Sequence, residues 1–214
     1  EWNEMQELMK PHFLYNTLES LEALILMEET EKSAKLVRSL GQFYRKSVSG
    51  GREFLTINEE IQIVKDYADI LKIRFGDSFK FDVRLDKTYG YYKIPKLTIQ
   101  PLVENAFQHG IRIQEKYGYI QVCVEGEENK IHISVKDNGK GIPKDIICEF
   151  EKGKMPDEKR SLGLRGTIQR LKMIYEGAFS YKIFNEGLAE VHIYIDSSVL
   201  EEEKCEKTES NCHR

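Results

Sequence analysis

The stretch "LMKPHFLYNTLESL" at residues 8–21 places a proline directly before His12 in a pattern that otherwise predicts a helix. At about 100° per residue, His12 is turned roughly 160° from Leu14 and shares the polar face with Asn16 and Glu19. An exposed imidazole titrates near neutrality and can present one ring nitrogen as a nucleophile or a ligand. The proline either opens the helix, where it is well tolerated, or kinks it. The alternative for His12 is an ordinary core histidine, which this helical geometry disfavours.

The stretch "PLVENAFQHG" at residues 101–110 predicts another helix with two distinct faces. Its polar side groups Glu104, Asn105, Gln108 and His109 opposite an apolar side. An amphipathic surface helix has the same pattern, so this stretch does not identify a site by itself.

Two glycine-containing stretches follow. In "DNGKGI" at residues 137–142, Asp137 ends an expected strand, where its carboxylate can accept a hydrogen bond from an amino group. Gly139 and Gly141 allow positive φ and a close approach of the backbone to a ligand, although Asn-Gly is also a common turn signal. In "SLGLRGTIQRL" at residues 161–171, glycines precede an expected helix whose first amides could bind phosphate. The alternative there is a plain glycine-rich loop before a helix.

The N-terminal part of the chain predicts two helices, at residues 5–29 and 31–48. Their apolar stripes are too extensive for two helices to bury alone, which favours a second copy and a four-helix bundle. The stripes consist of Leu14, Leu18, Leu21 and Ile25 in the first helix, and Ala34, Val37, Leu40, Tyr44 and Val48 in the second.

The remainder predicts an α/β sandwich, with helices on one face of an antiparallel or mixed sheet. Thr56 and Glu59 have the spacing of a capping box that opens a helix. Apolar residues alternate with polar ones, as in half-buried strands, at 79–85, 120–124, 131–135 and 191–195, and more weakly near 180–184. Further helices are expected at about 96–109, 143–151 and 164–176.

Composition narrows the classes of function. Acidic residues outnumber basic ones by 36 to 32, which argues against a nucleic-acid binder that depends on bulk charge. No apolar run approaches the roughly 18 residues that span a membrane. The four cysteines lack the spacing of a zinc site or a disulfide framework, so we expect reduced thiols.

Taken in order, "PHFLYNTL", "RFGD", "PLVENAFQHG", "DNGKGI" and "LGL" resemble the LytS-like sensor histidine kinases of bacterial two-component systems, over about residues 5–196. The resemblance implies an α+β chain. Residues 1–52 would form a dimeric four-helix bundle with the phosphoacceptor, and residues 53–198 a GHKL (Bergerat) α/β sandwich that binds ATP. We expect residues 199–214 to be a disordered tail.

The implied activity is that of a protein histidine kinase, which uses ATP and Mg²⁺ to phosphorylate itself. The phosphoryl group would then pass to an aspartate in the receiver domain of a response regulator. The implied protein is a homodimer, and this chain would be the cytoplasmic part of a bacterial sensor anchored in the membrane through an upstream region.

The resemblance also assigns roles to individual residues. His12 would be the phosphoacceptor, Glu104 a catalytic residue, Asn105 the Mg²⁺ ligand and Asp137 the acceptor for the adenine amino group. The other implied nucleotide-binding positions are Gln108, His109, Gly139, Gly141, Ile142, Gly163 and Leu164. Residues 143–162 would form the ATP lid, in which Lys154, Lys159 and Arg160 are candidate phosphate contacts or ordinary solubilising residues.

The sequence departs from the family pattern at Gln108, where a basic residue is usual, at Ser161, where glycine is usual, and at Gly166, where asparagine is common. The partner that orients His12 is left open among Asn16, Glu19 and Glu104.

Two other functions are possible on sequence grounds. The first is a GHKL-type ATP hydrolase. Enzymes of that type activate water with a glutamate four residues before the magnesium-binding asparagine. Pro101 holds that position here and cannot act as a base. The second is a catalytically weak ATP-binding dimerisation module.

Overall fold

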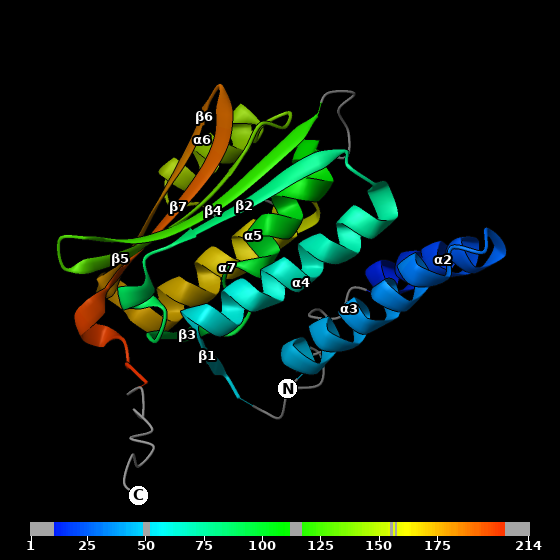
Figure 1. Ribbon diagram of the computed structural model, residues 1–214. Coiled ribbons are helices and arrows are strands. Elements are labelled where there is room, and N and C mark those ends of the chain that lie inside the picture. Colours follow the sequence, from blue (N-terminus) through cyan, green and yellow to red (C-terminus); the bar gives the residue numbers. More distant parts are fainter. Residues whose placement is uncertain (1–10, 49–51, 112–116, 155, 157, 204–214) are drawn as a thin grey trace, which may run out of the picture.

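The computed structural model (Figure 1) describes residues 11–48, 52–111, 117–154, 156 and 158–203. Helices α2 (Pro11–Leu26) and α3 (Thr30–Val48) form the expected N-terminal hairpin. Glu28 lies in the tight connection between them, with φ of 58°. In Figure 1 the hairpin packs alongside α4 (Ile57–Phe75), the first helix of the larger α/β part.

The α/β part is a mixed five-stranded sheet covered on one face by helices, as the alternating sequence pattern predicts. The strand order is β2-β4-β5-β7-β6, with β2 parallel to β4 and the remaining pairs antiparallel. Helices α4, α5 and α7 lie against one face of this sheet (Figure 1). The bounds are β2 Phe79–Leu85, β4 Gly118–Glu127, β5 Lys130–Asp137, β6 Phe179–Glu186, β7 Leu188–Asp196, α5 Gln100–Asn105, α6 Lys144–Glu151 and α7 Glu158–Tyr175.

The core lies between the sheet and these helices. Successive side chains of a strand point to opposite faces, so every second residue reaches the core. The central strands fill this layer with fully buried branched residues: Ile120, Val122 and Val124 in β4, Ile131, Ile133 and Val135 in β5, and Ile193 and Ile195 in β7.

A second, two-stranded sheet was not predicted from the sequence. β1 (Phe54–Thr56) pairs antiparallel with β3 (Lys93–Pro95) and leads directly into α4. Thr56 caps α4 in the predicted capping box with Glu59, whose carboxylate accepts the Thr56 amide at 2.9 Å. The first residues of the expected tail join this sheet, because the Lys93 amide donates to the Glu201 carbonyl at 2.8 Å.

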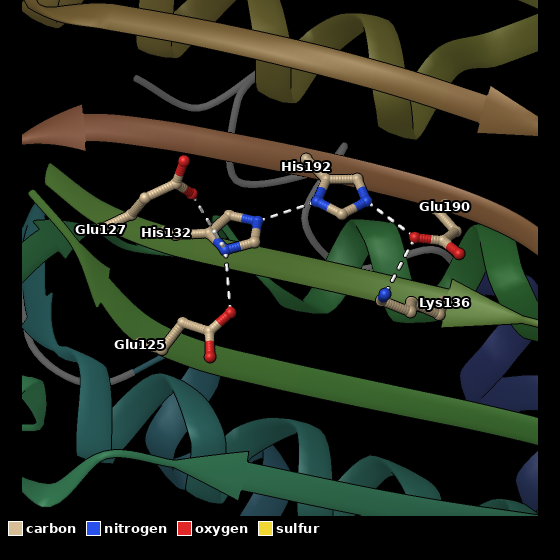
Figure 2. Close-up of polar contacts among 6 residues, drawn as sticks. All are labelled: Glu125, Glu127, His132, Lys136, Glu190 and His192. Carbon is tan, nitrogen blue, oxygen red and sulfur yellow. Dashed lines mark hydrogen bonds and ion pairs between the residues drawn. The ribbon is translucent and has the colours of Figure 1, made fainter.

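On the sheet face opposite the core helices, two buried histidines belong to a polar network (Figure 2). The His132 and His192 rings are joined by a 2.8 Å contact, and their outer nitrogens lie 3.2 Å from Glu125 and 2.8 Å from Glu190. Lys136 completes the network with a 2.9 Å ion pair to Glu190. Burial lowers the pKa of His192, and the contact with Glu190 opposes this fall.

Of the predicted apolar stripes, Leu21, Leu40 and Tyr44 pack partly buried against the core. Phe13, Leu36 and Phe43 form the buried contacts of the hairpin in a single chain. Other members of the predicted stripes are exposed in the single chain, with 44% of Leu18 and 52% of Val37 accessible to solvent. The reason is that α4, a partner distant in sequence, packs on the hairpin from another side.

Candidate active site

One short segment carries four of the predicted site residues, Glu104, Asn105, Gln108 and His109. Helix α5 continues without a break into a π-helical turn, Ala106–Ile111. Such turns are rare and occur frequently at functional sites, because the wider turn re-aims side chains. Compared with the helix expected at 96–109, α5 begins later, at Gln100, and the segment ends as a π-helical turn.

The start of α5 is fixed by Glu60, a residue that the sequence analysis missed. Its fully buried carboxylate accepts hydrogen bonds from the amides of residues 97–99, at 2.6, 3.0 and 3.0 Å. Burial raises the pKa of Glu60, and the amide donors and Arg170 act against this rise. Arg170 also donates to the Leu97 carbonyl at 2.7 Å. The sequence signal that could have identified Glu60 was its position as a glutamate on the otherwise apolar face of α4.

A cavity of about 470 Å³ opens beside this segment. Six of the predicted nucleotide-binding residues line it: Asn105, His109, Asp137, Gly141, Ile142 and Leu164. Most of the remaining wall is apolar, and it comes from α5, β5, α6, α7 and β7. A largely apolar cavity of this size with a few convergent polar groups is typical of a small-molecule site.

Asp137 is the buried acid of this cavity, with only 7% of its surface exposed. Its Oδ1 accepts the Gly139 amide at 2.8 Å. Burial raises the pKa of the carboxyl group to about 6, and the Gly139 amide opposes this rise. A buried carboxylate in apolar surroundings favours an additional donor, such as the amino group of a purine.

Gly139 and Gly141 are required by the geometry around Asp137. A Cβ on Gly139 would overlap the backbone of Gly110, so these two chain segments touch only because both positions are glycine. Gly141 has φ of 81°, a conformation that favours glycine. Asn185, also missed by the sequence analysis, lies against Gly141 and donates to the Ile142 carbonyl at 3.0 Å.

Positive charge reaches the cavity from lysines that the sequence analysis did not select. Lys140 and Lys144 both belong to its lining. The sequence could have indicated both lysines through their position shortly after Asp137. Lys140 lies inside the "DNGKGI" stretch, and Lys144 begins α6. Lys154, a lid residue proposed earlier, is exposed. The side chains of Lys159 and Arg160 lie outside the described part of the chain.

The prediction that glycines precede the last helix is wrong. Helix α7 begins at Glu158, so Gly163 and Leu164 lie within it and their amides are not those of a helix N-terminus. Glu, Lys, Arg and Leu are good helix formers, which explains the earlier start. Gly163 nevertheless adjoins the site, because a Cβ there would come within 3.0 Å of the Asn105 amide nitrogen.

The residues present fit an adenosine triphosphate with Mg²⁺. In such a site Asp137 would supply the acceptor, the apolar wall would receive a purine ring, and the two lysines would counter the charge of the phosphates. Mg²⁺ commonly takes only one or two protein ligands and completes its shell with phosphate oxygens and water. The Asn105 amide oxygen suits this, and among the described residues no group of three His, Cys, Asp or Glu side chains forms an alternative site.

His12 lies exposed on α2, as predicted, beside a second and much smaller cavity of about 20 Å³. Of the three suggested partners, Asn16 contacts its ring, with the amide nitrogen 3.0 Å from Nδ1. Gln108 lines this small cavity and not the larger one beside Asp137. Glu104 is buried, and its carboxylate accepts the Gln108 amide at 2.8 Å. Glu19 is exposed on α2.

Comparison with known protein families gives two matches in tandem. Residues 1–79 match the histidine kinase family, and residues 93–198 match the family described as histidine kinase-, DNA gyrase B-, and HSP90-like ATPase. Within the described residues, no helix combines the length and apolar character needed to cross a bilayer.

Among solved structures, the histidine kinase domain of the blue-light activated kinase EL346 from Erythrobacter litoralis aligns with a TM-score of 0.51 at 19% identity. The alignment covers 81% of this chain and 83% of that one. A bacterial phosphotransferase aligns with a TM-score of 0.54 at 14% identity, over 91% and 96% of the two chains. At these identities the likeness establishes the fold alone.

Curated sequence relatives are named as sensor histidine kinases and sensor proteins. The chain is 33% identical to the sensor histidine kinase YesM of Bacillus subtilis over 87% of its length, and 31% identical to YpdA of Escherichia coli over 91%. It is 28% identical to the sensor protein LytS of B. subtilis over 88%. The chain spans only 31–34% of the length of these relatives. With both family matches and these relatives, the chain belongs to the LytS-like sensor histidine kinases.

Proposed function

We propose that this chain is an ATP- and Mg²⁺-dependent autokinase that phosphorylates His12 and then passes the phosphoryl group to an aspartate of a response regulator. One observation carries the proposal. The segment 100–111 lines the nucleotide cavity with Asn105 and His109, and it lines the cavity beside His12 with Gln108. A nucleotide site and a nucleophile therefore flank the same few residues.

In this proposal each residue of the larger cavity has a specific task. Asp137 accepts the adenine amino group, Gly141 leaves room for the nucleotide at the cavity wall, and Gly139 lets Gly110 approach closely beside Asp137. Lys140 and Lys144 counter the phosphate charge, and Asn105 holds Mg²⁺. ATP supplies the γ-phosphoryl group. The chain contributes mainly position and charge stabilisation, which is typical of phosphoryl transfer.

His12 supplies the nucleophile. The lone pair of one ring nitrogen forms the bond to phosphorus, and the bond from phosphorus to the leaving oxygen of ADP breaks. The other ring nitrogen gives up its proton to solvent, to which the ring is exposed. Asn16 orients the ring through its contact with the imidazole. Glu104, held by Gln108, is the nearest buried carboxylate on the opposing segment and serves as a positioning group.

The hydrolase alternative has no supporting observation. The residue that would have to activate water is Pro101, in the first turn of α5. Glu104 is buried and already accepts the Gln108 amide. A base for water must reach the attacking proton at about 2.6–3.2 Å, directly or through one water.

We further propose that the chain is a homodimer. Large apolar side chains remain exposed on the hairpin, among them Leu18, Ile25, Leu26, Met27 and Val37. A patch of this kind is unusual on a monomer and suits a symmetric bundle with a second copy. We also propose that the chain is the cytoplasmic catalytic part of a longer, membrane-anchored sensor. This follows from relatives named as sensors, of which it spans about a third.

The test is incubation with γ-labelled ATP and Mg²⁺, followed by assay for label that is lost in acid and kept in base. His12→Ala should abolish labelling while nucleotide affinity, measured by calorimetry, stays unchanged. Glu22→Ala, another exposed change on α2, is the matched control and should label normally. Undiminished label in His12→Ala would refute the assignment.

A further inference from the structure

Helix α2 packs on α4 of the same chain through the side that carries Phe13, the residue after His12. Phe13 is buried in an aromatic cluster with Phe43 of α3 and Tyr67 of α4. Its ring centre lies 5.5 Å from that of Phe43 and 5.2 Å from that of Tyr67. One turn further along α2, Thr17 is fully buried, and its hydroxyl donates to the Phe13 carbonyl at 2.7 Å. These contacts define the rotation of α2 against α4.

Two polar contacts join the hairpin to α4, one before and one after Tyr67 along that helix. Lys46 of α3 forms an ion pair with the buried carboxylate of Asp66. Arg74 donates from Nε to the Ser20 hydroxyl of α2 at 3.3 Å. The hairpin is therefore attached to α4 over about two helical turns, and not at a single point.

This packing brings His12 beside the segment that lines the larger cavity of the same chain. The small cavity beside His12 has Phe13 and Tyr67 in its wall, and Gln108 as well. Asn105, three positions before Gln108, lines the larger cavity proposed for the nucleotide. The contacts that seat α2 on α4 thus also set the distance between the imidazole and that segment.

The side of α2 that is available to a second copy points elsewhere. At about 100° per residue, Leu18 is turned roughly 140° from Phe13 and roughly 120° from His12. Leu18 and Ile25 are exposed in the single chain, whereas Phe13 is buried. A symmetric bundle formed through Leu18 and Ile25 therefore leaves α2 on the α4 of its own chain and keeps His12 turned away from the dimer contact.

The connection between the hairpin and the α/β part is short. Residues 49–53 separate α3, which ends at Val48, from β1, which begins at Phe54. A stretch of this length spans at most roughly 20 Å. Each hairpin is therefore kept near the α/β part of its own chain.

We propose that the packing of α2 on α4, centred on Phe13, presents His12 to ATP bound by the same chain, so that phosphorylation takes place in cis. The proposal rests on the proposed autokinase function. Phe13 is a positioning residue, because it lies outside the lining of the larger cavity. Within one chain, the bond from a His12 ring nitrogen to the γ-phosphorus forms as the bond from phosphorus to the ADP oxygen breaks. The proton of the other ring nitrogen passes to solvent.

Mixed dimers of full chains that carry two different affinity tags test the cis assignment. The first dimer pairs His12→Ala with Asn105→Ala, so one chain lacks the acceptor and the other lacks the proposed Mg²⁺ ligand. The second pairs the unmodified chain with a double variant that carries both changes. Phosphorylation in cis predicts background label in the first dimer. It predicts label on the unmodified chain of the second dimer, at the rate per intact chain of the unmodified dimer.

Label in the first dimer, or absence of label in the second, overturns the cis assignment. If the chain is a monomer in solution, the labelling rate per chain at increasing protein concentration replaces the mixed dimers. A constant rate supports phosphorylation in cis, and a rate that rises with concentration overturns it. Absence of His12 label in the unmodified chain would overturn the autokinase function itself, which distinguishes the two failures.

Phe13→Ala tests the positioning role. Small misplacements of reacting groups cost on the order of 100-fold in rate, which we expect for His12 labelling at saturating ATP. ATP affinity in calorimetry and the oligomeric state in light scattering should match those of the unmodified chain, because Phe13 lies outside the larger cavity and the exposed apolar side of α2. Tyr15→Ala removes an exposed aromatic side chain from the same helix and should label normally. An unchanged rate in Phe13→Ala, or a loss accompanied by weaker ATP binding or an altered oligomeric state, overturns this role.

Discussion

The burial of the Asp137 carboxyl group can be tested quantitatively through protein stability alone. Burial raises its pKa from 3.8 to about 6. Each pKa unit corresponds to about 1.4 kcal/mol, so keeping this group ionised at neutral pH costs the folded chain about 3 kcal/mol. Asp137→Asn removes the titrating group, while the amide oxygen can still accept the Gly139 amide.

The sign of the effect follows from where the proton is held more tightly. The folded-state pKa lies above the unfolded value, so the folded chain binds the proton more strongly between these values. Stability contributed by this group is complete below about pH 4 and is lost as the pH rises through about 6. Asp137→Asn should therefore stabilise the chain at pH 7.5 and leave it nearly unchanged at pH 4.

For a chain of this size, about 3 kcal/mol corresponds to a rise in Tm of about 6–12 °C. Thermal unfolding at the two pH values measures it, with Asp69→Asn, an exposed change on α4, as the control. The same variant should bind ATP more weakly, because an acceptor for the adenine amino group is altered. An unchanged Tm at pH 7.5, or an equal gain at both pH values, would refute the buried and ionised state of Asp137.

Three further changes test other parts of the structure. Glu60→Gln should lower the free energy of unfolding by about 1–3 kcal/mol and weaken ATP binding, since an amide cannot accept as the carboxylate does; chemical denaturation and calorimetry measure both effects. Gly139→Ala should abolish ATP binding in calorimetry while the chain stays folded, because the added Cβ overlaps Gly110. Leu18→Asp should convert a dimer to a monomer in light scattering, and a monomeric unmodified chain at micromolar concentration would contradict the proposed dimer.

Local patterns predicted most of the fold. The alternation in residues 131–135 continues through β5, and the capping box at Thr56 marks the start of α4. Both signals lie within a few residues, so no distant partner was needed to read them. The polar position of His12 follows from helical geometry in the same way. By contrast, β1 and β3 span three residues each, too few for a period to emerge.

What the sequence analysis missed depends on distant contacts. Glu60 is positioned in α4 but accepts from amides almost forty residues later, which no local pattern encodes. Asn185 reaches Ile142 across a similar separation. Helix α4 determines which side of the hairpin is buried. Spacing along the sequence was therefore enough to identify the apolar residues of the hairpin, but not the surface that each of them contacts.

The segment 100–111 is held at both ends, and this suggests how the two cavities are linked. Glu60 fixes its start, and the close approach of Gly110 to Gly139 fixes its end beside Asp137. Between these points Asn105 faces the nucleotide cavity and Gln108 faces His12. A ligand that acts on Asp137 or Asn105 therefore acts on the same short backbone that presents Gln108. Because that backbone is held by buried contacts at both ends, it fixes the placement of Asn105 in the larger cavity relative to Gln108 beside His12.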